Sequence, residues 1–558
     1  MPLPTSWGPI DGGRLTRRGF MAAGIAGGLT LAACDHSKPQ APSSANKMAD
    51  AIAAAEAARP HRGRTVTASL TPQLTQIDLG GPVVRTLAFG DKLPGPLIRA
   101  TVGDELVVKV SNKLDHPTSV HWHGIALRNN MDGAEPATPN IEAGQEFTYQ
   151  FSVPNSGTYW AHPHTGLDED MGLYLPVVIE DPTEGDYDVE WVVVLDDWTD
   201  GVGKSPQQLY QELTNPNKSG MPGMPGMSNM PAAPETTPTS PTTSTTSTSE
   251  TTSTSETTST SETTSTTATT STSPPTSAAA MPPARVGSSE LLGGDAGDIP
   301  YPYYLINGRI PAAPTTFNAK PGQRIRIRFI NTGSDTAFRV ALAGHTMTVT
   351  HTDGFRVVPR QVDALLIGMA ERYDVIVTAA DGVFPLVALA EGKGSLARAL
   401  LSTGQGSVPD PLFQPAELTK RVGTIEMFTA ATSAMLSRPK PGVNLPVVLG
   451  GNMAQYDWTI NGEPYSRTNP LHVRQGQRPT ITFDNTTMMY HPIHLHGHTF
   501  QLINADGSLG ARKDTVIVLP KQKLLAVLVA DNPGVWQMHC HNTYHQVAGM
   551  MTRLEYVF

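Results

Sequence analysis

Cysteine is scarce in this sequence, since the 558 residues include only Cys34 and Cys540. Two cysteines exclude a disulfide framework as the basis of the fold. Charged residues make up only 16%, the net charge is −10, and no block of basic residues occurs, which argues against a nucleic-acid partner. By contrast, 51 glycines and 48 prolines indicate many turns. The 17 histidines are therefore the residues most suited to carry chemistry.

Residues 1–33 predict an export signal. Arg17 and Arg18 form a twin-arginine pattern, and the mostly apolar run at 21–33 is too short for a permanent membrane-spanning helix. The run ends in Leu-Ala-Ala-Cys, which resembles a bacterial lipoprotein box with Cys34 as the lipidated residue. We therefore expect twin-arginine export, an extracytoplasmic location and a lipid anchor to the membrane. The alternative is an ordinary signal peptide with an incidental cysteine.

Short β-branched runs separated by Gly, Pro and Asn predict an all-β protein of sandwich or barrel domains. The clearest expected strands are at residues 105–110, 145–153, 176–180, 191–195, 324–330, 373–378, 480–484, 514–519 and 524–529. Three times a Gly turn precedes a strand that ends at an asparagine, at Asn112, Asn331 and Asn485, and this loose repeat predicts three domains of one kind. The expected segments are a tether with a short Ala-rich helix at 34–60 and domains at 61–182, 187–405 and 420–558.

The middle domain carries an insertion at about residues 214–290. Within residues 231–280, 40 of 50 residues are Ser, Thr or Pro and none is aromatic, so this segment cannot bury enough apolar area to fold and is expected to be disordered. Just before it, residues 221–230 repeat Met at every third position. Thioethers are soft ligands suited to Cu(I), although a low-complexity edge with fortuitous Met residues is the alternative.

Most of the histidines lie in four clusters at short spacings. They are His121 and His123; His162 and His164; His491, His494 and His496; and His539, His541 and His545. Alternate residues of a strand share a face, so a single His-x-His pair can be an ordinary feature of a core. Four such clusters in one chain are very hard to obtain from packing alone, and they predict metal binding.

The last cluster predicts two separate sites. On a strand, His539 and His541 point one way and Cys540 the other, so one short segment can serve a site on each face. Two imidazoles, a thiolate and a weak axial thioether make a mononuclear blue-copper site. His491, Cys540, His545 and Met550 supply that set, and the other eight clustered histidines remain for a second centre.

These motifs resemble the three-domain bacterial multicopper oxidases, a family with laccases and cuprous oxidases among its members. The resemblance covers about residues 65–558 apart from the insertion, and it implies three consecutive cupredoxin-like Greek-key β-sandwich domains and four copper ions. It implies type 1 copper on His491, Cys540, His545 and Met550, and type 2 copper on His121 and His494. It implies one type 3 copper on His123, His162 and His541, and the other on His164, His496 and His539.

The resemblance also implies a reaction, in which a substrate gives single electrons to type 1 copper and O2 is reduced to water at the other three coppers. Electrons would pass from Cys540 to its neighbours His539 and His541. Asp132 resembles the acidic residue that delivers protons near type 2 copper, with a simple turn-forming role as the alternative. Bacterial relatives often have a Glu directly after the last type 1 histidine, whereas this sequence has Gln546.

The substrate expected first is Cu(I), oxidised to Cu(II) in copper tolerance. The Met run, the expected lipid anchor, and Met488 and Met489 just before His491 favour it, although these two methionines could instead pack in a core. Where cuprous oxidases often have an Asp, this chain has Thr486 and Thr487. The runner-up is a laccase-type oxidase of phenols or aromatic amines. A copper-storage lipoprotein and a copper-free scaffold are the non-enzyme alternatives.

Overall fold

The computed structural model describes residues 44–185, 187–215, 286–440 and 442–558. The expected export signal, the lipid anchor on Cys34, the Met run and the Ser/Thr/Pro-rich segment lie outside these ranges. Within them, none of the helices is long and apolar enough to span a membrane.

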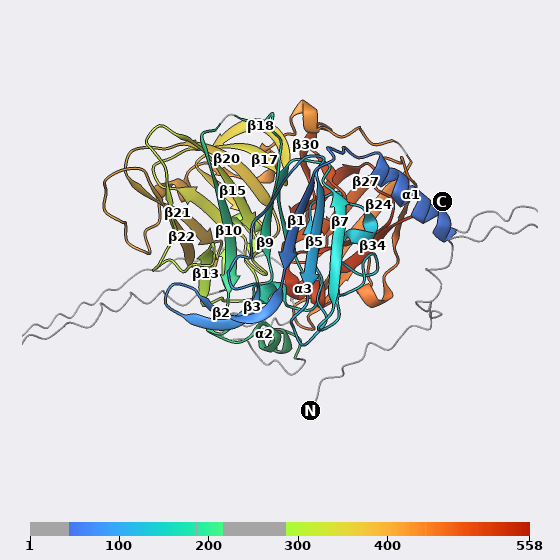
Figure 1. Ribbon diagram of the computed structural model, residues 1–558, viewed down its shortest axis with the longest axis horizontal. Coiled ribbons are helices and arrows are strands. Elements are labelled where there is room, and N and C mark those ends of the chain that lie inside the picture. Colours follow the sequence, from blue (N-terminus) through green and yellow to red (C-terminus); the bar gives the residue numbers. More distant parts are fainter. Residues whose placement is uncertain (1–43, 186, 216–285, 441) are drawn as a thin grey trace, which may run out of the picture. The chain divides into compact units, whose positions relative to one another are not determined.

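The described chain consists mainly of short strands in three successive groups (Figure 1). The first group is β1 (Thr65–Leu70), β2 (Pro72–Asp78), β3 (Val83–Phe89), β4 (Ile98–Thr101), β5 (Glu105–Ser111), β6 (His121–His123), β7 (Glu146–Ser152), β8 (Gly157–His162) and β9 (Leu175–Glu180). The second group is β10 (Val189–Trp198), β11 (Ser288–Ser289), β12 (Gly294–Asp295), β13 (Tyr303–Ile306), β14 (Thr316–Asn318), β15 (Arg324–Asn331), β16 (Phe338–Leu342), β17 (Met347–Thr352), β18 (Phe355–Val362), β19 (Ala364–Ile367), β20 (Arg372–Thr378), β21 (Val383–Ala390), β22 (Leu396–Ser402) and β23 (Val422–Gly423). The third group is β24 (Asn444–Asn452), β25 (Asp457–Ile460), β26 (Leu471–Val473), β27 (Thr480–Asn485), β28 (His491–Leu495), β29 (Phe500–Ile503), β30 (Leu509–Lys513), β31 (Thr515–Val518), β32 (Lys523–Leu528), β33 (Val535–Cys540) and β34 (Met551–Tyr556). The α-helices are α1 (Ser44–Ala57), α2 (Pro206–Leu213) and α3 (Thr543–Val547).

The three groups repeat one sheet topology. In the first sheet of each group a parallel pair is followed by an antiparallel strand, namely β1-β5-β7, β10-β15-β20 and β24-β27-β32. The second sheets are β4-β9-β8-β6, β14-β22-β21-β16-β19-β23 and β26-β34-β33-β28-β31. The predicted all-β class is therefore confirmed, and its non-consecutive strand neighbours are typical of Greek-key sandwiches.

The asparagines that the sequence repeat singled out make the same contacts in each group. The side-chain oxygens of Asn112, Asn331 and Asn485 each accept a hydrogen bond from the backbone N–H two residues ahead. Each side-chain nitrogen donates to two or three backbone carbonyls of the following loop and of a more distant segment. One amide thus fixes the turn after the strand, because buried backbone groups need such partners.

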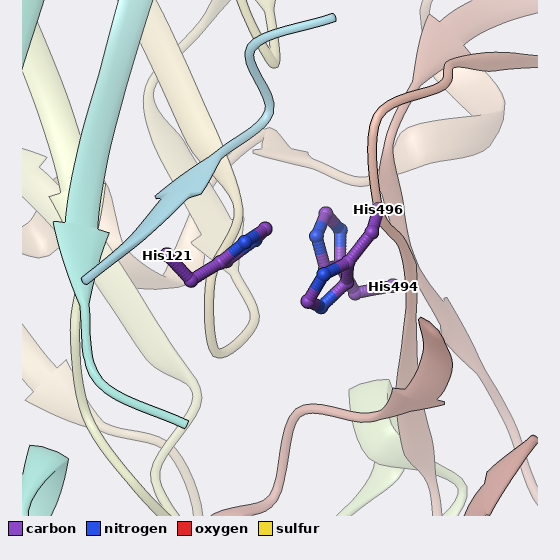
Figure 2. A group of neighbouring side chains, drawn as sticks. All are labelled: His121, His494 and His496. Atoms are coloured by element: carbon purple, nitrogen blue, oxygen red, sulfur yellow. The ribbon is translucent and has the colours of Figure 1, made fainter. Parts of the chain in front are cut away.

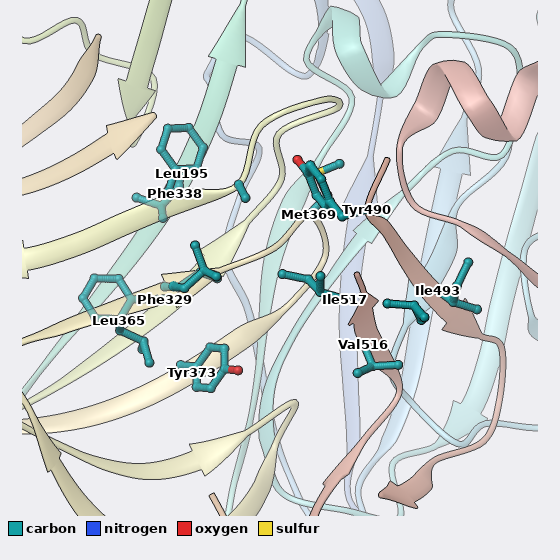
Figure 3. Packing of buried hydrophobic residues seen from close by; sticks show 14 of the residues in the cluster. Leu195, Phe329, Phe338, Leu365, Met369, Tyr373, Tyr490, Ile493, Val516 and Ile517 are labelled. Atoms are coloured by element: carbon teal, nitrogen blue, oxygen red, sulfur yellow. The ribbon is translucent and has the colours of Figure 1, made fainter. Parts of the chain in front are cut away.

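The second and third groups share one hydrophobic core, which Figure 3 shows from close by. Tyr490 of the third group donates a hydrogen bond to the sulfur of Met369 in the second, at 3.6 Å. At Gly368 a Cβ atom would lie 2.7 Å from the Ile517 side chain, so the two groups approach too closely for a larger residue. The first group has its own buried cluster.

Part of the expected tether is attached to the strand groups. Residues Ser44–Ala57 form α1, in agreement with the predicted Ala-rich helix. The Glu56 carboxylate accepts hydrogen bonds from the N–H and hydroxyl of Ser152, and Arg59 donates to Asn532. These contacts connect the helix to the first and third groups.

Candidate metal centres

Eight buried or half-buried histidines converge from two strand pairs of different domains. In the first group His121 of β6 lies opposite His162 of β8, and in the third His494 of β28 lies opposite His539 of β33. The rings of His121 and His496 stack with centroids 3.7 Å apart, as do those of His123 and His494. Figure 2 shows His121 facing His494 and His496 across the gap between the two strand groups.

The nitrogens of these rings form three-membered groups with the geometry of metal ligands. In each group the possible ligand atoms lie within 4.8 Å of one another. The groups are His123, His162 and His541; His164, His496 and His539; His121, His494 and His496; and His121, His162 and His164. The first three groups draw on both the first and the third strand group, so the centre they form exists only when these domains pack together.

Backbone carbonyls hold one side of several rings and leave the other side free. The Nδ1 atom of His121 lies 2.9 Å from the Asp132 carbonyl. The Nδ1 atom of His162 lies 3.1 Å from the Pro163 carbonyl, and that of His494 lies 3.0 Å from the Asp514 carbonyl. The Nε2 atoms of these three rings are buried and have no hydrogen-bond partner among the described residues. An unpaired buried polar atom is costly, and bound metal would satisfy each of these three.

Burial also sets the protonation that metal binding requires. Desolvation lowers the pKa of His162, His164, His496, His539 and His541 well below the usual histidine range, because a charged ring is disfavoured away from water. These rings are therefore neutral near pH 7, and neutral imidazole is the metal-binding form.

Asp132, to which the resemblance gives a role in proton delivery, lies against the cluster. Its Oδ2 is 2.8 Å from Nδ1 of His496, and its Oδ1 is 3.3 Å from Nδ1 of His121. The next residue, Gly133, has a φ of 83°, and a Cβ atom there would collide with the Val120 backbone. Only glycine suits this turn, which brings the carboxylate back beside His121.

A second site lies on the other face of β33. The Cys540 sulfur is 3.6 Å from Nδ1 of His491 and 3.7 Å from Nδ1 of His545, and the two nitrogens are 3.1 Å apart. Met550 is buried beside them, since its N–H donates to the His545 carbonyl and its carbonyl accepts from the Cys540 N–H. The strand alternation expected around Cys540 is thus present.

Polar groups surround the Cys540 site and fix its ligands. Thr487 Oγ1 lies 2.8 Å from Nε2 of His491, and Asp298 Oδ2 lies 3.0 Å from Nε2 of His545. The Asn542 N–H donates to the Cys540 sulfur at 3.4 Å. Burial raises the pKa of the Cys540 thiol, so the thiolate needs a cation beside it to form.

Matches to known proteins agree with this geometry. Family models described as multicopper oxidase match residues 73–184, 284–406 and 438–557. The chain is 66% identical to "Multicopper oxidase MmcO" of Mycobacterium tuberculosis, over 100% of this chain and 99% of that protein. The chain belongs to the multicopper oxidase family.

Other relatives of this multicopper oxidase are more distant. It is 28% identical to the copper resistance protein A homolog of Pseudomonas syringae pv. tomato, over 86% of this chain and 90% of that one. Among solved structures, the laccase from Botrytis aclada has a TM-score of 0.65 at 23% identity, with 90% of this chain and 89% of that chain covered. Fet3p, described as a multicopper oxidase that functions in iron import, has a TM-score of 0.67 at 19% identity, with 88% and 90% covered. These structures support the cupredoxin-like fold.

Family membership makes this protein a copper oxidoreductase that uses O2, and its residues fit copper. Eight imidazoles with unpaired or inward-facing nitrogens form one centre. Two imidazoles and the buried thiol of Cys540 form the other. Imidazole and thiolate are ligands that copper accepts in proteins.

Several residues around the multicopper centres were not found by sequence reasoning. Asp514 Oδ1 lies 3.2 Å from Nε2 of His123, and its carboxylate also pairs with Arg372 of the second strand group. Asp298 comes from the same group, just after residues 216–285, and no motif marks it. Only Thr487 carries a signal in the sequence, since Thr486 and Thr487 stand where cuprous oxidases often have an Asp.

Met488 and Met489 have different environments. Met489 is buried in the core that the second and third groups share, so core packing explains it. Met488 is 72% exposed, next to Thr487, whose hydroxyl contacts His491. Core packing therefore does not explain Met488.

The thioether of Met550 should tune the reduction potential of the Cys540 site. We expect Met550→Leu to raise this potential, because a weak axial donor that favours Cu(II) is lost. Potentiometric titration of the blue absorption would measure the change. An unchanged or lower potential would mean that Met550 is not the axial ligand.

Proposed function

We propose that this multicopper oxidase oxidises Cu(I) to Cu(II) and couples this to the four-electron reduction of O2 to two waters. One observation carries the proposal. Cys540 faces His491 and His545, while the residues on either side of it in sequence, His539 and His541, face the eight-histidine cluster. An electron that enters at the sulfur therefore has a short covalent path to the cluster.

The copper assignment that we propose uses the three-membered groups. Type 1 copper would be held by His491, Cys540, His545 and Met550. The two type 3 coppers would be held by His123, His162 and His541 and by His164, His496 and His539, and type 2 copper by His121 and His494. Bound at these positions, four coppers would supply four one-electron steps, the number that O2 needs to become water.

The protein residues have separate tasks in this proposal. Buried rings keep water from the centres, and Cys540 connects the two faces of β33. Asp132 contacts one ligand from each domain, His121 and His496. Its Oδ1 has no hydrogen-bond partner among the described residues, and in this proposal it passes a proton toward the cluster.

Cu(I) is the substrate that best suits the surroundings of type 1 copper. Met488 offers an exposed soft thioether near His491, and Asp298 places a carboxylate against His545. The relatives described as copper resistance protein A point to the same role. Export by the twin-arginine route and a lipid anchor on Cys34 would place this activity outside the cytoplasmic membrane.

A laccase-type activity on phenols or aromatic amines is the second candidate, favoured by the similarity to curated laccases of Botryotinia fuckeliana at 26–28% identity. A copper-storage role has less support, because storage has no use for a sulfur site connected to an oxygen-reducing cluster. Catalytic consumption of O2 would exclude storage.

The Met run at 221–230 separates the two substrates. We expect replacement of Met221, Met224, Met227 and Met230 by Ser to weaken Cu(I) oxidation at low Cu(I), since hydroxyls are poor Cu(I) ligands. Phenol oxidation should stay equal or become faster, because phenols give their electron directly near His491. The measurement is steady-state O2 consumption over a concentration series of each donor.

The matched control is deletion of residues 231–280, which removes Ser and Thr but no Met from that run. It should change Cu(I) oxidation little. If the four-Met variant loses Cu(I) and phenol turnover in equal proportion, the run serves structure and gives no support to Cu(I) as the substrate.

A further inference from the structure

A buried carboxylate that no motif singled out lies behind the cluster. Glu169 begins the short 3-10 helix η2 (Glu169–Met171), which follows His164 in the first strand group. Its side chain is only 4% exposed.

The Glu169 carboxylate faces two histidines of one ligand group. Oε2 lies 2.8 Å from Nδ1 of His162, and Oε1 lies 3.8 Å from Nδ1 of His541. Oε1 and both ring nitrogens of His541 have no hydrogen-bond partner among the described residues. His162 and His541 form one ligand group with His123, and they come from different domains, His162 from β8 and His541 from directly after β33.

We propose that Glu169 is a positioning residue that holds His162 and His541 together as ligands of one type 3 copper. This proposal rests on the copper assignment above. A ring that binds metal through Nε2 carries its proton on Nδ1, and a carboxylate has an acceptor oxygen for each of two such N–H groups. Together with the Pro163 carbonyl, Glu169 thereby favours the Nδ1–H tautomer of His162. Its other oxygen is offered to Nδ1 of His541 from 3.8 Å, so one carboxylate connects the first and third domains at the copper.

Two substitutions test this role by acceptor count. Leu at position 169 offers no acceptor, whereas Gln keeps the shape and offers one acceptor oxygen for two N–H groups. Asp170→Asn is the matched control, because Asp170 is the next residue and is equally buried, yet its carboxylate accepts from the hydroxyls of Tyr301 and Tyr544.

The experiment uses the full-length copper-loaded protein and measures copper retained per chain over a series of chelator concentrations. Absorption of the blue site and the fraction of copper visible by electron paramagnetic resonance are recorded alongside. We expect Glu169→Leu to lose cluster copper at about 10- to 100-fold lower chelator concentration, the usual effect of removing a partner of a metal-bound histidine. Glu169→Gln should be intermediate, Asp170→Asn should match the wild type, and blue absorption should persist in all of them.

Three outcomes would overturn the proposal. The first is that Glu169→Leu retains cluster copper as well as Asp170→Asn does, and the second is that Glu169→Gln matches the wild type. The third is that blue and cluster copper are lost in parallel, which indicates a purely structural role. If Glu169→Leu does not fold, the near-isosteric Glu169→Gln decides by the same measurement. Wild-type copper content and blue absorption test the proposed function separately, since they do not depend on any substitution at position 169.

Discussion

The variant Cys540→Ser is expected to lose the intense blue absorption and all oxidase activity. The Cys540 sulfur is the only soft anionic donor among the ligand atoms of its site, which also include the two imidazoles of His491 and His545. A serine oxygen is a poor substitute, because copper sites of this kind owe their properties to the thiolate. The sulfur is also the start of the proposed electron path to His539 and His541.

The cluster should survive this change, since none of its eight histidines is altered. Absorption spectroscopy, copper analysis and O2 consumption on the purified variant together check the prediction. Cys34→Ser is the matched control, because it removes the other cysteine and should leave both colour and turnover intact. A blue Cys540→Ser protein would remove Cys540 from the site.

The second large effect is expected for Asp132→Asn. This change keeps the size of the side chain but removes its negative charge beside His121 and His496, and an amide cannot pass a proton as a carboxylate does. We expect oxidation of the donor-reduced protein by O2 to slow by about 10²-fold or more, within the 10²–10⁴-fold range of general acid–base effects.

Rapid mixing of the reduced variant with O2, followed by return of the blue colour, measures this step directly. Reduction of the blue site by the donor should be unchanged, because Asp132 lies on the cluster side of β33. Asp104→Asn is the control, as Asp104 is a buried first-domain carboxylate that contacts Arg64 and the Thr101 N–H. If reoxidation of Asp132→Asn is as fast as that of the control, Asp132 has only a turn-forming role.

The structure separates or replaces residues that the sequence had suggested for the substrate and for proton transfer. The pair Met488 and Met489 looked alike in sequence, and the fold separates them into an exposed thioether and a core side chain. At position 546 the sequence has Gln where the resemblance implied a carboxylate. The structure shows a buried carboxylate in another segment, where Glu169 lies against two histidines of the cluster.

The sequence by itself determined the features that depend on neighbours along the chain. The His-x-His spacing puts two rings on one strand face, and His539, Cys540 and His541 divide between two faces because strand side chains alternate. Asn112, Asn331 and Asn485 end equivalent strands for the same local reason, since each side chain bonds the backbone two residues ahead.

Tertiary structure alone decided which remote groups complete the centres. Asp298, Asp514 and Glu169 approach His545, His123 and His541 from segments 247, 391 and 372 residues away in sequence. Such contacts depend on how the three sandwiches pack, and an isolated acidic residue has no periodic neighbours that would reveal its partner. The ligands follow the two-residue period of a strand, whereas the carboxylates that orient them follow the packing of whole domains.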